Sequence, residues 1–369
     1  MPATPRLDDL RRYAVARTLF TPTTLLAAIR RLGFVQADPI RAPARAQDLI
    51  LRHRVKGYQA GDLERRYARL PVEEDCLVNY GFLPREHLAL MHPRVSSRMW
   101  DTATVRKAVE VLEFVQARGS VHPREVDQAF AHGRVTNYWG GTSNASTHLL
   151  DGMHYRGMLR VQRRDSGTRI YSVAAHAEAE TGAAAQAQRA SALIDLVVGT
   201  YAPLPAASLT YLVRLLGYGA PHLAVPLQQA LRDARNTLAS ATVEGTTWYW
   251  PAVENPRSRR FVGQERVRLL APFDPVVWDR RRFERLWGWV YKFEAYTPAA
   301  KRQFGYYALP LLWRDQVIGW ANVGARNGSL QTDVGYASGK PPREAAFRNA
   351  LEDELQRMRA FLHGASDEP

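Results

Sequence analysis

Gln36 and Asp38 are the polar side chains of an otherwise largely apolar stretch, residues 34–40 (Phe-Val-Gln-Ala-Asp-Pro-Ile). The apolar residues and the proline predict a short extended segment, in which alternate side chains face the same way. A carboxylate beside an amide is suited to holding one water molecule, because the carboxylate accepts its proton while the amide donates and accepts hydrogen bonds. Asp38 and Gln36 are therefore our candidate catalytic residues.

The position of Asp38 before Pro39 also has a purely structural interpretation. Aspartate is a favoured N-cap and proline is favoured at the first helical position, so the pair is typical of the start of a helix. We predict such a helix over residues 40–55. A capping carboxylate spends acceptor capacity on backbone amides, which conflicts with catalysis. The spacing alone leaves both interpretations open.

Arginine dominates the charge of this chain. The sequence has 50 lysine and arginine residues against 36 aspartate and glutamate residues, a formal net charge of +14, and only five of the basic residues are lysines. Arginine suits bidentate contacts with phosphate and base edges, although a codon bias toward arginine gives the same composition. The charge therefore indicates a nucleic-acid partner rather than a carbohydrate or a lipid. The arginines that flank the candidate pair are Arg30, Arg31, Arg41, Arg45, Arg52 and Arg54.

Several other kinds of site are excluded by composition. Cys76 is the only cysteine, which excludes a disulfide framework and a cysteine zinc site, and no His-Glu-x-x-His spacing occurs. We expect no metal and no cofactor. No apolar run approaches about 18 residues, so no transmembrane helix is expected, and the charged residues 1–10 do not match a secretion signal. These features predict a cytoplasmic, nucleoid-associated protein.

The chain is long enough for two or more hydrophobic cores, and its patterns predict an α+β fold of four domains. Residues 1–98 begin with helices over 5–19 and 23–32, followed by the extended segment and the helix over 40–55. This order is the front half of a winged-helix (helix-turn-helix) unit. The remainder of this domain, residues 58–95, is predicted to be helical and irregular.

Residues 99–176 are predicted to form a second winged-helix domain. Arg163 and Arg164 lie near the tip of its hairpin, which is either a DNA-contacting wing or a solvated edge whose charges prevent aggregation. Residues 137–142 lead into its last helix, for which we expect an N-cap near Thr142 or Ser143. The predicted elements are helices over 104–118, 124–131 and 143–156, and the hairpin over 158–173.

A third winged-helix domain is predicted over residues 177–264, and the last domain, residues 265–369, changes character. Its apolar and alternating runs predict an antiparallel sheet or small β-barrel with a closing helix. The third domain is predicted to have helices over 189–199, 205–216 and 221–234 and a hairpin over 239–250. The last domain is predicted to have strands over 266–270, 290–295, 305–313, 316–323 and 329–334 and a helix over 342–362.

Charged residues of the last domain allow two further interpretations. Asp274, Asp279 and Glu284 lie five residues apart, a spacing that suggests the ligands of a metal-dependent nuclease, but the first two are more typical of turn and cap residues. A basic patch is the better candidate for phosphate contact, with a solvated run of charge as the alternative. This patch consists of Arg280, Arg281, Arg282, Lys301 and Arg302.

Five stretches resemble the crosslink-repair DNA glycosylases of the YcaQ (AlkX/AlkZ) family, and the resemblance spans residues 5 to about 335. They are residues 32–38 (LGFVQAD), 44–46 (ARA), 81–85 (GFLPR), 270–280 (LAPFDPVVWDR) and 296–310 (YTPAAKRQFGYYALP). The resemblance implies tandem winged helices in a C-shaped, DNA-embracing scaffold with a small β-barrel. It also implies removal of alkylated bases and unhooking of interstrand crosslinks. The family's catalytic motif is Gln-x-Gln in one branch and Gln-x-Asp in the other, and Gln36-Ala37-Asp38 matches the second.

The chain departs from the family pattern at two places. Residues 76–80 lack the histidine and glutamate of the corresponding family run, and residues 139–144 (Trp-Gly-Gly-Thr-Ser-Asn) differ from the Trp- and Lys-rich start of the second recognition helix. These departures concern substrate range or activity itself. The alternative to a glycosylase is a non-catalytic winged-helix DNA-binding protein, such as a transcription regulator.

The resemblance and the charge pattern together predict a monofunctional enzyme that acts on double-stranded DNA carrying alkylated bases or crosslinks. Lys56 is the only lysine near the motif in sequence, so we expect no Schiff-base lyase step. No coiled-coil heptad occurs, so we expect a monomer. The predicted catalytic residues are Asp38 and Gln36, and the predicted DNA contacts are Arg41, Arg45, Arg52, Arg163, Arg164, Arg280, Arg281, Arg282, Lys301 and Arg302.

Overall fold

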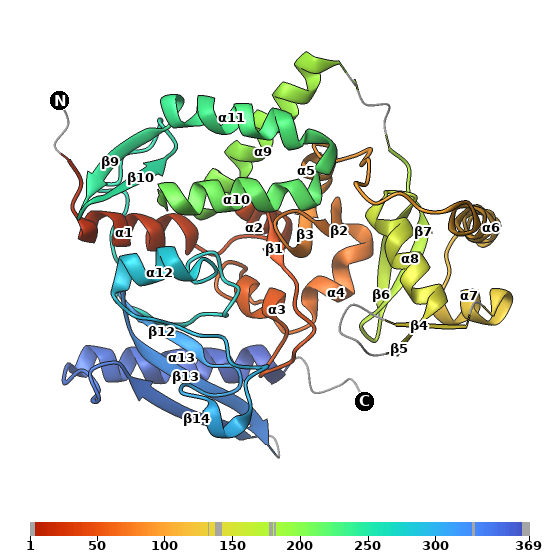
Figure 1. Ribbon diagram of the computed structural model, residues 1–369. Helices are drawn as coiled ribbons and strands as arrows, with labels where there is room; N and C mark the ends of the chain where they lie inside the picture. The colour runs from red at the N-terminus through yellow and green to blue at the C-terminus, as the bar shows by residue number, and fades with distance from the viewer. Residues whose placement is uncertain are drawn as a thin grey trace. The chain divides into compact units, whose positions relative to one another are not determined.

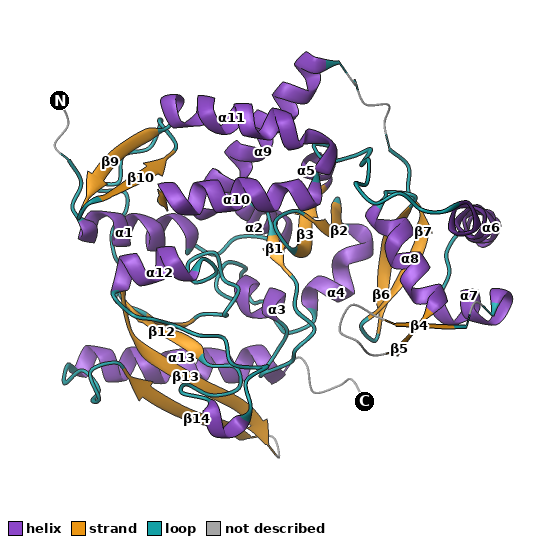
Figure 2. Cartoon of the chain, in the orientation of Figure 1, coloured by secondary structure: helices purple, strands orange, loops and turns teal. Residues whose placement is uncertain are grey.

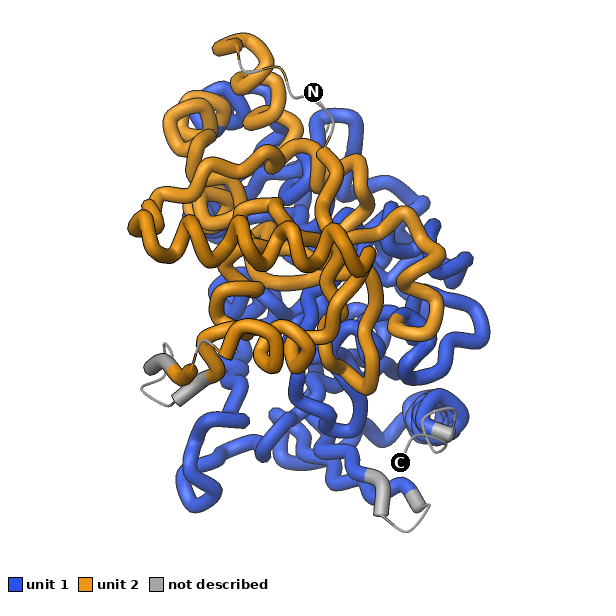
Figure 3. Tube along the Cα trace, turned by 90° about the vertical axis from the view of Figure 1, so that its right-hand side faces the viewer, with its two compact units in different colours: residues 1–63, 194–212, 231–369 blue, residues 64–193, 213–230 orange. Residues whose placement is uncertain are grey.

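The computed structural model describes residues 4–131, 133–136, 142–176, 180, 182–326 and 329–363. The chain forms two compact units (Figure 3). Unit 1 comprises residues 1–63, 194–212 and 231–369, and unit 2 comprises residues 64–193 and 213–230. Several described helices contribute residues to both units. They are α4 (Asp62–Arg66), α9 (Ala183–Tyr201), α10 (Ala206–Gly219) and α11 (Ala224–Thr237). The four sequence domains are a different division of the chain, and they stay a prediction.

The N-terminal elements of unit 1 confirm two of the three predicted helices. The elements are α1 (Leu7–Thr18), α2 (Leu25–Leu32), β1 (Val35–Gln36) and α3 (Ala46–Leu51). The side chain of Thr24 accepts a hydrogen bond from the backbone N–H of Ala27, and Gly33 ends α2 with a φ of 76°.

The predicted helix over 40–55 is wrong in length, because helical structure covers only α3, residues 46–51. Two prolines explain the delay. Pro39 disfavours helical backbone at residue 38, and Pro43 has no N–H to donate and disfavours helical backbone at residue 42. The residues between β1 and α3 therefore form a loop that carries Asp38.

Unit 2 contains a hairpin that the sequence did not reveal. It pairs β2 (Val72–Cys76) with β3 (Tyr80–Pro84) in antiparallel register, where a helical and irregular segment was predicted. The short helices α4 (Asp62–Arg66), η1 (Tyr67–Arg69) and α5 (Arg85–Leu88) lie on either side of it in the chain. Strand β2 carries Glu73, Glu74 and Asp75, all buried, and consecutive acidic residues are poor predictors of a buried strand.

The second predicted group of helices and hairpin is confirmed within unit 2. Its elements are α6 (Thr102–Arg118), α7 (Pro123–Phe130), β4 (Arg134–Thr136), β5 (Thr142–Asn144), α8 (Ala145–Tyr155), β6 (Leu159–Asp165) and β7 (Thr168–Val173). The N-cap of α8 is Asn144, whereas it was predicted near Thr142 or Ser143, one or two residues earlier. Residues 137–141, which include half of the family departure at 139–144, lie outside the described residues.

The remaining part of unit 1 holds two antiparallel sheets (Figures 1 and 2). One has the order β8-β10-β9, and the other has the order β11-β12-β13-β14 with α13 packed against β11. The predicted hairpin, sheet and closing helix are confirmed. The elements are β8 (Leu204–Pro205), η2 (Pro221–Leu223, in unit 2), β9 (Ala239–Val243), β10 (Thr246–Trp250), β11 (Val267–Leu269), α12 (Arg280–Trp287), η3 (Ala299–Lys301), β12 (Leu309–Trp313), β13 (Gln316–Arg326), β14 (Ser329–Tyr336) and α13 (Ala345–His363).

The strand predicted over 290–295 is wrong, because this segment is a loop. The carboxylate of Glu294 accepts hydrogen bonds from the backbone N–H groups of Gln303 (3.0 and 2.9 Å), Phe304 (2.7 Å) and Gly305 (3.3 Å). A side chain thus satisfies donors that strand pairing would otherwise satisfy. The fold as a whole is mixed α and β with antiparallel sheets.

Two buried charged residues hold the segment before and within α12. Asp274 accepts two hydrogen bonds from Arg54, at 2.8 and 3.0 Å, and one from the backbone N–H of Val276 at 3.0 Å. Arg282 donates to the carbonyl oxygens of Pro203 (2.8 Å) and Pro275 (3.2 Å). The family-like stretch 270–280 is therefore in large part a structural device of unit 1.

Candidate active site

Asp38 lies in the loop between β1 and α3 and is half-buried. Its Oδ1 accepts a hydrogen bond from the backbone N–H of Ile40 at 2.9 Å, and its own N–H donates to Oε1 of Gln47 at 3.4 Å. A bond to the N–H two residues on is an Asx turn. No helix begins at Pro39, so the interpretation of Asp38 as a helix N-cap is wrong.

The surroundings of Asp38 favour its use as a base. Burial raises the pKa of Asp38, and the hydrogen bond from Ile40 opposes part of this shift. A carboxylate with a raised pKa accepts a proton more readily, which brings it closer to the range that suits general base catalysis near neutral pH.

Gln36 is the last residue of β1 and is 4% exposed. Its Oε1 atom is buried and has no hydrogen-bond partner among the residues that the structure describes. Buried polar atoms are nearly always paired, so an unpaired buried acceptor is an unusual feature that calls for a partner. This amide is suited to orienting a small polar molecule.

Tyr307 is a further residue whose pKa the charge of Asp38 affects, and sequence reasoning missed it. Its side chain is 3% exposed, and its hydroxyl has no hydrogen-bond partner within the described part of the chain. Burial raises the pKa of Tyr307 well above its usual value, and the nearby charge of Asp38 raises it further. The hydroxyl therefore stays protonated and is a donor. The stretch 296–310 was noted for its family resemblance, but spacing along it does not tell which residue approaches Asp38.

The predicted DNA contacts differ in exposure. Arg41, Arg281 and Lys301 in unit 1 and Arg163 in unit 2 are exposed. Arg45, Arg280 and Arg302 are half-buried; Arg280 donates to the carbonyl oxygen of Val277 at 2.6 Å, and Arg302 donates to that of Thr297 at 2.8 Å. The exposed members are accessible to phosphate, and the half-buried ones retain a partly accessible surface.

Three of the predicted DNA contacts are corrected by the structure. The side chain of Arg52 is buried, forms an ion pair with Glu354 and donates to Leu269. Arg282 is fully buried and is bound to backbone carbonyl oxygens. Arg164 forms a bidentate pair with Glu74, at 2.8 and 2.6 Å. Each of these guanidinium groups donates hydrogen bonds to protein acceptors, and these bonds stabilise the fold.

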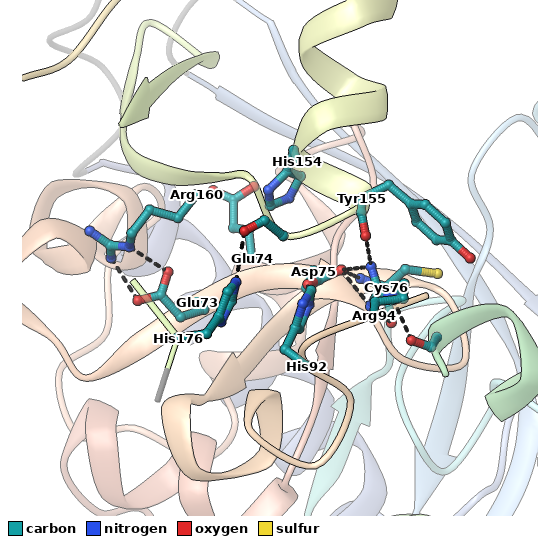
Figure 4. Close-up of polar contacts among 12 residues, drawn as sticks. Glu73, Glu74, Asp75, Cys76, His92, Arg94, His154, Tyr155, Arg160 and His176 are labelled. Carbon is teal, nitrogen blue, oxygen red and sulfur yellow. Dashed lines mark hydrogen bonds and ion pairs between the residues drawn. The ribbon is translucent and has the colours of Figure 1, made fainter. Parts of the chain in front are cut away.

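A second cluster of ionisable groups lies in unit 2, around β2 (Figure 4). Glu73 accepts hydrogen bonds from Arg160 at 3.0 and 2.7 Å, and Asp75 accepts them from His92 at 2.6 Å and Arg94 at 3.0 Å. Burial alone would raise the pKa of Asp75, but the hydrogen bond from His92 and the charge of Arg94 hold that pKa well below its usual range.

This second cluster is structural rather than catalytic. Each carboxylate of β2 faces a cationic or imidazole partner, and alternate side chains of a strand point to opposite faces, so partners are needed on both sides. A cavity of about 700 Å³ adjoins the cluster and is lined in part by Glu73, His92 and His176. Among the described residues, no group of three or more His, Cys, Asp or Glu side chains is arranged to hold a metal ion.

The fold matches the solved structure of Streptomyces sahachiroi DNA glycosylase AlkZ with a TM-score of 0.62 over 97% of each chain, at 14% sequence identity. At this identity the likeness shows the fold alone. A family model described as DNA glycosylase AlkZ-like matches residues 29–361.

This chain belongs to the AlkZ-like DNA glycosylase family, which confirms the resemblance drawn from its sequence. It is accordingly a glycosylase of DNA repair, a hydrolase whose substrate is DNA. Among the described residues, no helix is long and apolar enough to cross a membrane.

Proposed function

We propose that this glycosylase hydrolyses the N-glycosidic bond of alkylated purines in double-stranded DNA, with Asp38 and Gln36 at the reacting sugar. The observation that carries this proposal is the placement of Asp38, half-buried in a loop beside β1 with a raised pKa, rather than at a helix terminus. Gln36 with its unpaired Oε1 and Tyr307 with its unpaired hydroxyl support it.

The proposed reaction needs little assistance at the leaving group. Alkylation of a purine ring nitrogen makes the base cationic, so it departs with the electron pair of the bond to C1′ of the deoxyribose and becomes neutral. The sugar passes through a state resembling an oxocarbenium ion, which the negative charge of Asp38 stabilises. A water oxygen bonds to C1′ and its proton passes to the Asp38 carboxylate, while Gln36 orients the water.

Two finer properties are part of the same proposal. The enzyme is monofunctional, because the water rather than a lysine amine attacks C1′. Its reaction also unhooks interstrand crosslinks, since a crosslinked purine carries the same cationic ring nitrogen as a simple alkylated purine.

We further propose how duplex DNA is held. The helix and hairpin groups of residues 1–98, 99–176 and 177–264 act as tandem winged-helix units in a C-shaped monomer, followed by the sheet domain of residues 265–369. Arg41, Arg281, Lys301 and Arg163 contact phosphate, and their exposure supports this role. Arg45, Arg280 and Arg302 contribute through their accessible surfaces.

The test is base release from duplex DNA that carries 7-methylguanine or a nitrogen-mustard crosslink, with a chelator present. Wild-type protein should release the base and leave an alkali-labile site, and Asp38→Asn should lower the rate about 100-fold or more. Asp8→Asn is the matched control, because Asp8 is an exposed carboxylate of α1. Full activity of Asp38→Asn would remove Asp38 from the mechanism, and binding without base release would instead indicate a non-catalytic DNA-binding protein.

A further inference from the structure

A series of aromatic rings leads from the neighbourhood of Asp38 to the protein surface. Tyr307, whose hydroxyl is within the influence of the Asp38 charge, contacts Phe293 with ring centroids 5.3 Å apart. Phe293 in turn contacts Tyr296 at 6.1 Å and Phe273 at 5.1 Å. All of these residues belong to unit 1.

The exposure of these rings increases along the series. Tyr307 is 3% exposed, Phe293 is half-buried and Tyr296 is 81% exposed. An aromatic ring that served only the hydrophobic core would gain its stabilisation from burial, which Tyr296 largely forgoes. A single exposed tyrosine is common on protein surfaces. This one differs because its ring continues a series of ring contacts that begins at Tyr307, whose pKa is raised in part by the charge of Asp38.

The loop that presents Tyr296 is held firmly. Glu294 accepts hydrogen bonds from the backbone of residues 303–305, and Arg302 donates to the carbonyl oxygen of Thr297 at 2.8 Å. The side-chain amide of Asn322 donates to the carbonyl oxygen of Phe304 at 2.8 Å. A ring on a loop held in this way loses little conformational entropy when it binds a partner.

The charge beside Tyr296 matches a nucleic acid. Lys301, the last residue of η3, is exposed, and Arg302 lies over the ring of Tyr306 at 5.1 Å from its centroid. Exposed rings next to cationic side chains are the usual means by which proteins hold unpaired bases, because every base presents a π face and its phosphate attracts the cation.

We propose that Tyr296 and Phe293 form a stacking platform for the unpaired base of the target nucleotide, and that this platform favours cationic, alkylated purines over neutral ones. This inference rests on the proposed function, because it places the base next to the sugar on which Asp38 acts. The preference for a cationic base follows from the electron-rich face of the tyrosine ring.

The experiment measures binding separately from catalysis. The full chain carries Asp38→Asn, and the probes are oligonucleotides with a mismatched 7-methylguanine or a mismatched, fluorescent 2-aminopurine. Substituting Tyr296 by Ala or Leu should weaken binding of the 7-methylguanine probe by about 5- to 100-fold and abolish quenching of 2-aminopurine fluorescence. Substituting it by Phe or Trp should preserve both readouts, since these residues keep an aromatic face.

Controls separate stacking from a general loss of structure. Tyr218→Ala removes another exposed tyrosine, one that belongs to unit 2, and should leave both readouts unchanged. The inference is overturned if Tyr296→Leu binds and quenches like the parent protein, or if Tyr296→Phe loses binding as Ala does. The proposed preference for cationic purines is refuted if Tyr296→Ala weakens binding of the 7-methylguanine probe and the 2-aminopurine probe equally. A fully active Asp38→Asn enzyme would instead refute the catalytic proposal and leave the stacking result to stand by itself.

Discussion

The buried pair of Arg54 and Asp274 makes a sharp prediction about stability. Both side chains have 0% exposure, and two hydrogen bonds of 2.8 and 3.0 Å join them. Asp274→Ala leaves the guanidinium of Arg54 buried without a countercharge, and breaking a buried pair costs about 3–5 kcal/mol. The backbone N–H of Val276 also loses its acceptor, which adds about 1 kcal/mol. The sum, about 4–6 kcal/mol, is a large part of the about 5–15 kcal/mol by which proteins are typically stable.

Urea denaturation followed by fluorescence measures this loss. Asp8→Ala is the control, since it breaks the exposed pair of Asp8 with Arg11 and should change the free energy of unfolding by less than about 1 kcal/mol. The double variant Arg54→Met, Asp274→Leu should be more stable than Asp274→Ala, because it removes the uncompensated charge. A change of less than about 1 kcal/mol in Asp274→Ala would refute a structural role for this carboxylate.

Other substitutions test the site, the packing of unit 2 and the basic surface. Asp38→Asn should lower the rate of base release about 100-fold or more yet raise the free energy of unfolding at neutral pH. Burial raises the pKa of Asp38 in the folded protein, so its charged form destabilises the fold. This destabilisation is complete above the pKa of Asp38 in the folded protein and absent below its pKa in the unfolded chain. In the wild type, base release should fall as pH falls through the folded pKa. Gly219→Ala should destabilise unit 2 by about 1–3 kcal/mol, because its Cβ would lie 2.6 Å from the carbonyl oxygen of Cys76. Arg281→Met should reduce the slope of log binding constant against log salt concentration (the salt slope) for duplex DNA by about one, and leave stability unchanged. Arg282→Met should instead lower the urea concentration at the midpoint of unfolding and leave the salt slope unchanged.

Each of these has a result that contradicts it. A pH profile of base release that is flat through the acid range would exclude Asp38 as the titrating base. Gly217→Ala is the control for Gly219, because nothing lies within 4 Å of its added Cβ; equal stability of the two variants would refute the steric argument. A salt slope that changes with Arg282 rather than with Arg281 would reverse our assignment of the basic patch.

Local sequence patterns were sufficient for most helices and for several strands. Gly33 ends α2 directly after the helix predicted over 23–32, because a left-handed glycine acts within a turn of the helix, whereas the N-cap is Thr24, inside the predicted range. Gln36 and Asp38 were recognised because their types and spacing are themselves chemical information. The same local reasoning failed between β1 and α3, where two prolines outweighed an otherwise favourable helix pattern.

Features that depend on residues far apart in the chain were not predictable. The strand that carries Glu73, Glu74 and Asp75 exists because arginines from later segments neutralise its charges and His92 donates a hydrogen bond to Asp75. Whether an arginine faces solvent likewise depends on distant partners: adjacent Arg281 and Arg282 differ because only the second reaches the carbonyl oxygens of Ala202 and Pro203.

The sequence by itself determined the family, the basic character and the Gln-x-Asp pair, because these depend on residue types and short spacings. Only the tertiary structure decided that Asp38 is not a helix cap, that Tyr307 approaches it, and which arginines are engaged in the interior. The physical reason is that burial and charge pairing join residues that are distant in sequence. A carboxylate's pKa and an arginine's availability are set by those neighbours, not by the adjacent residues along the chain.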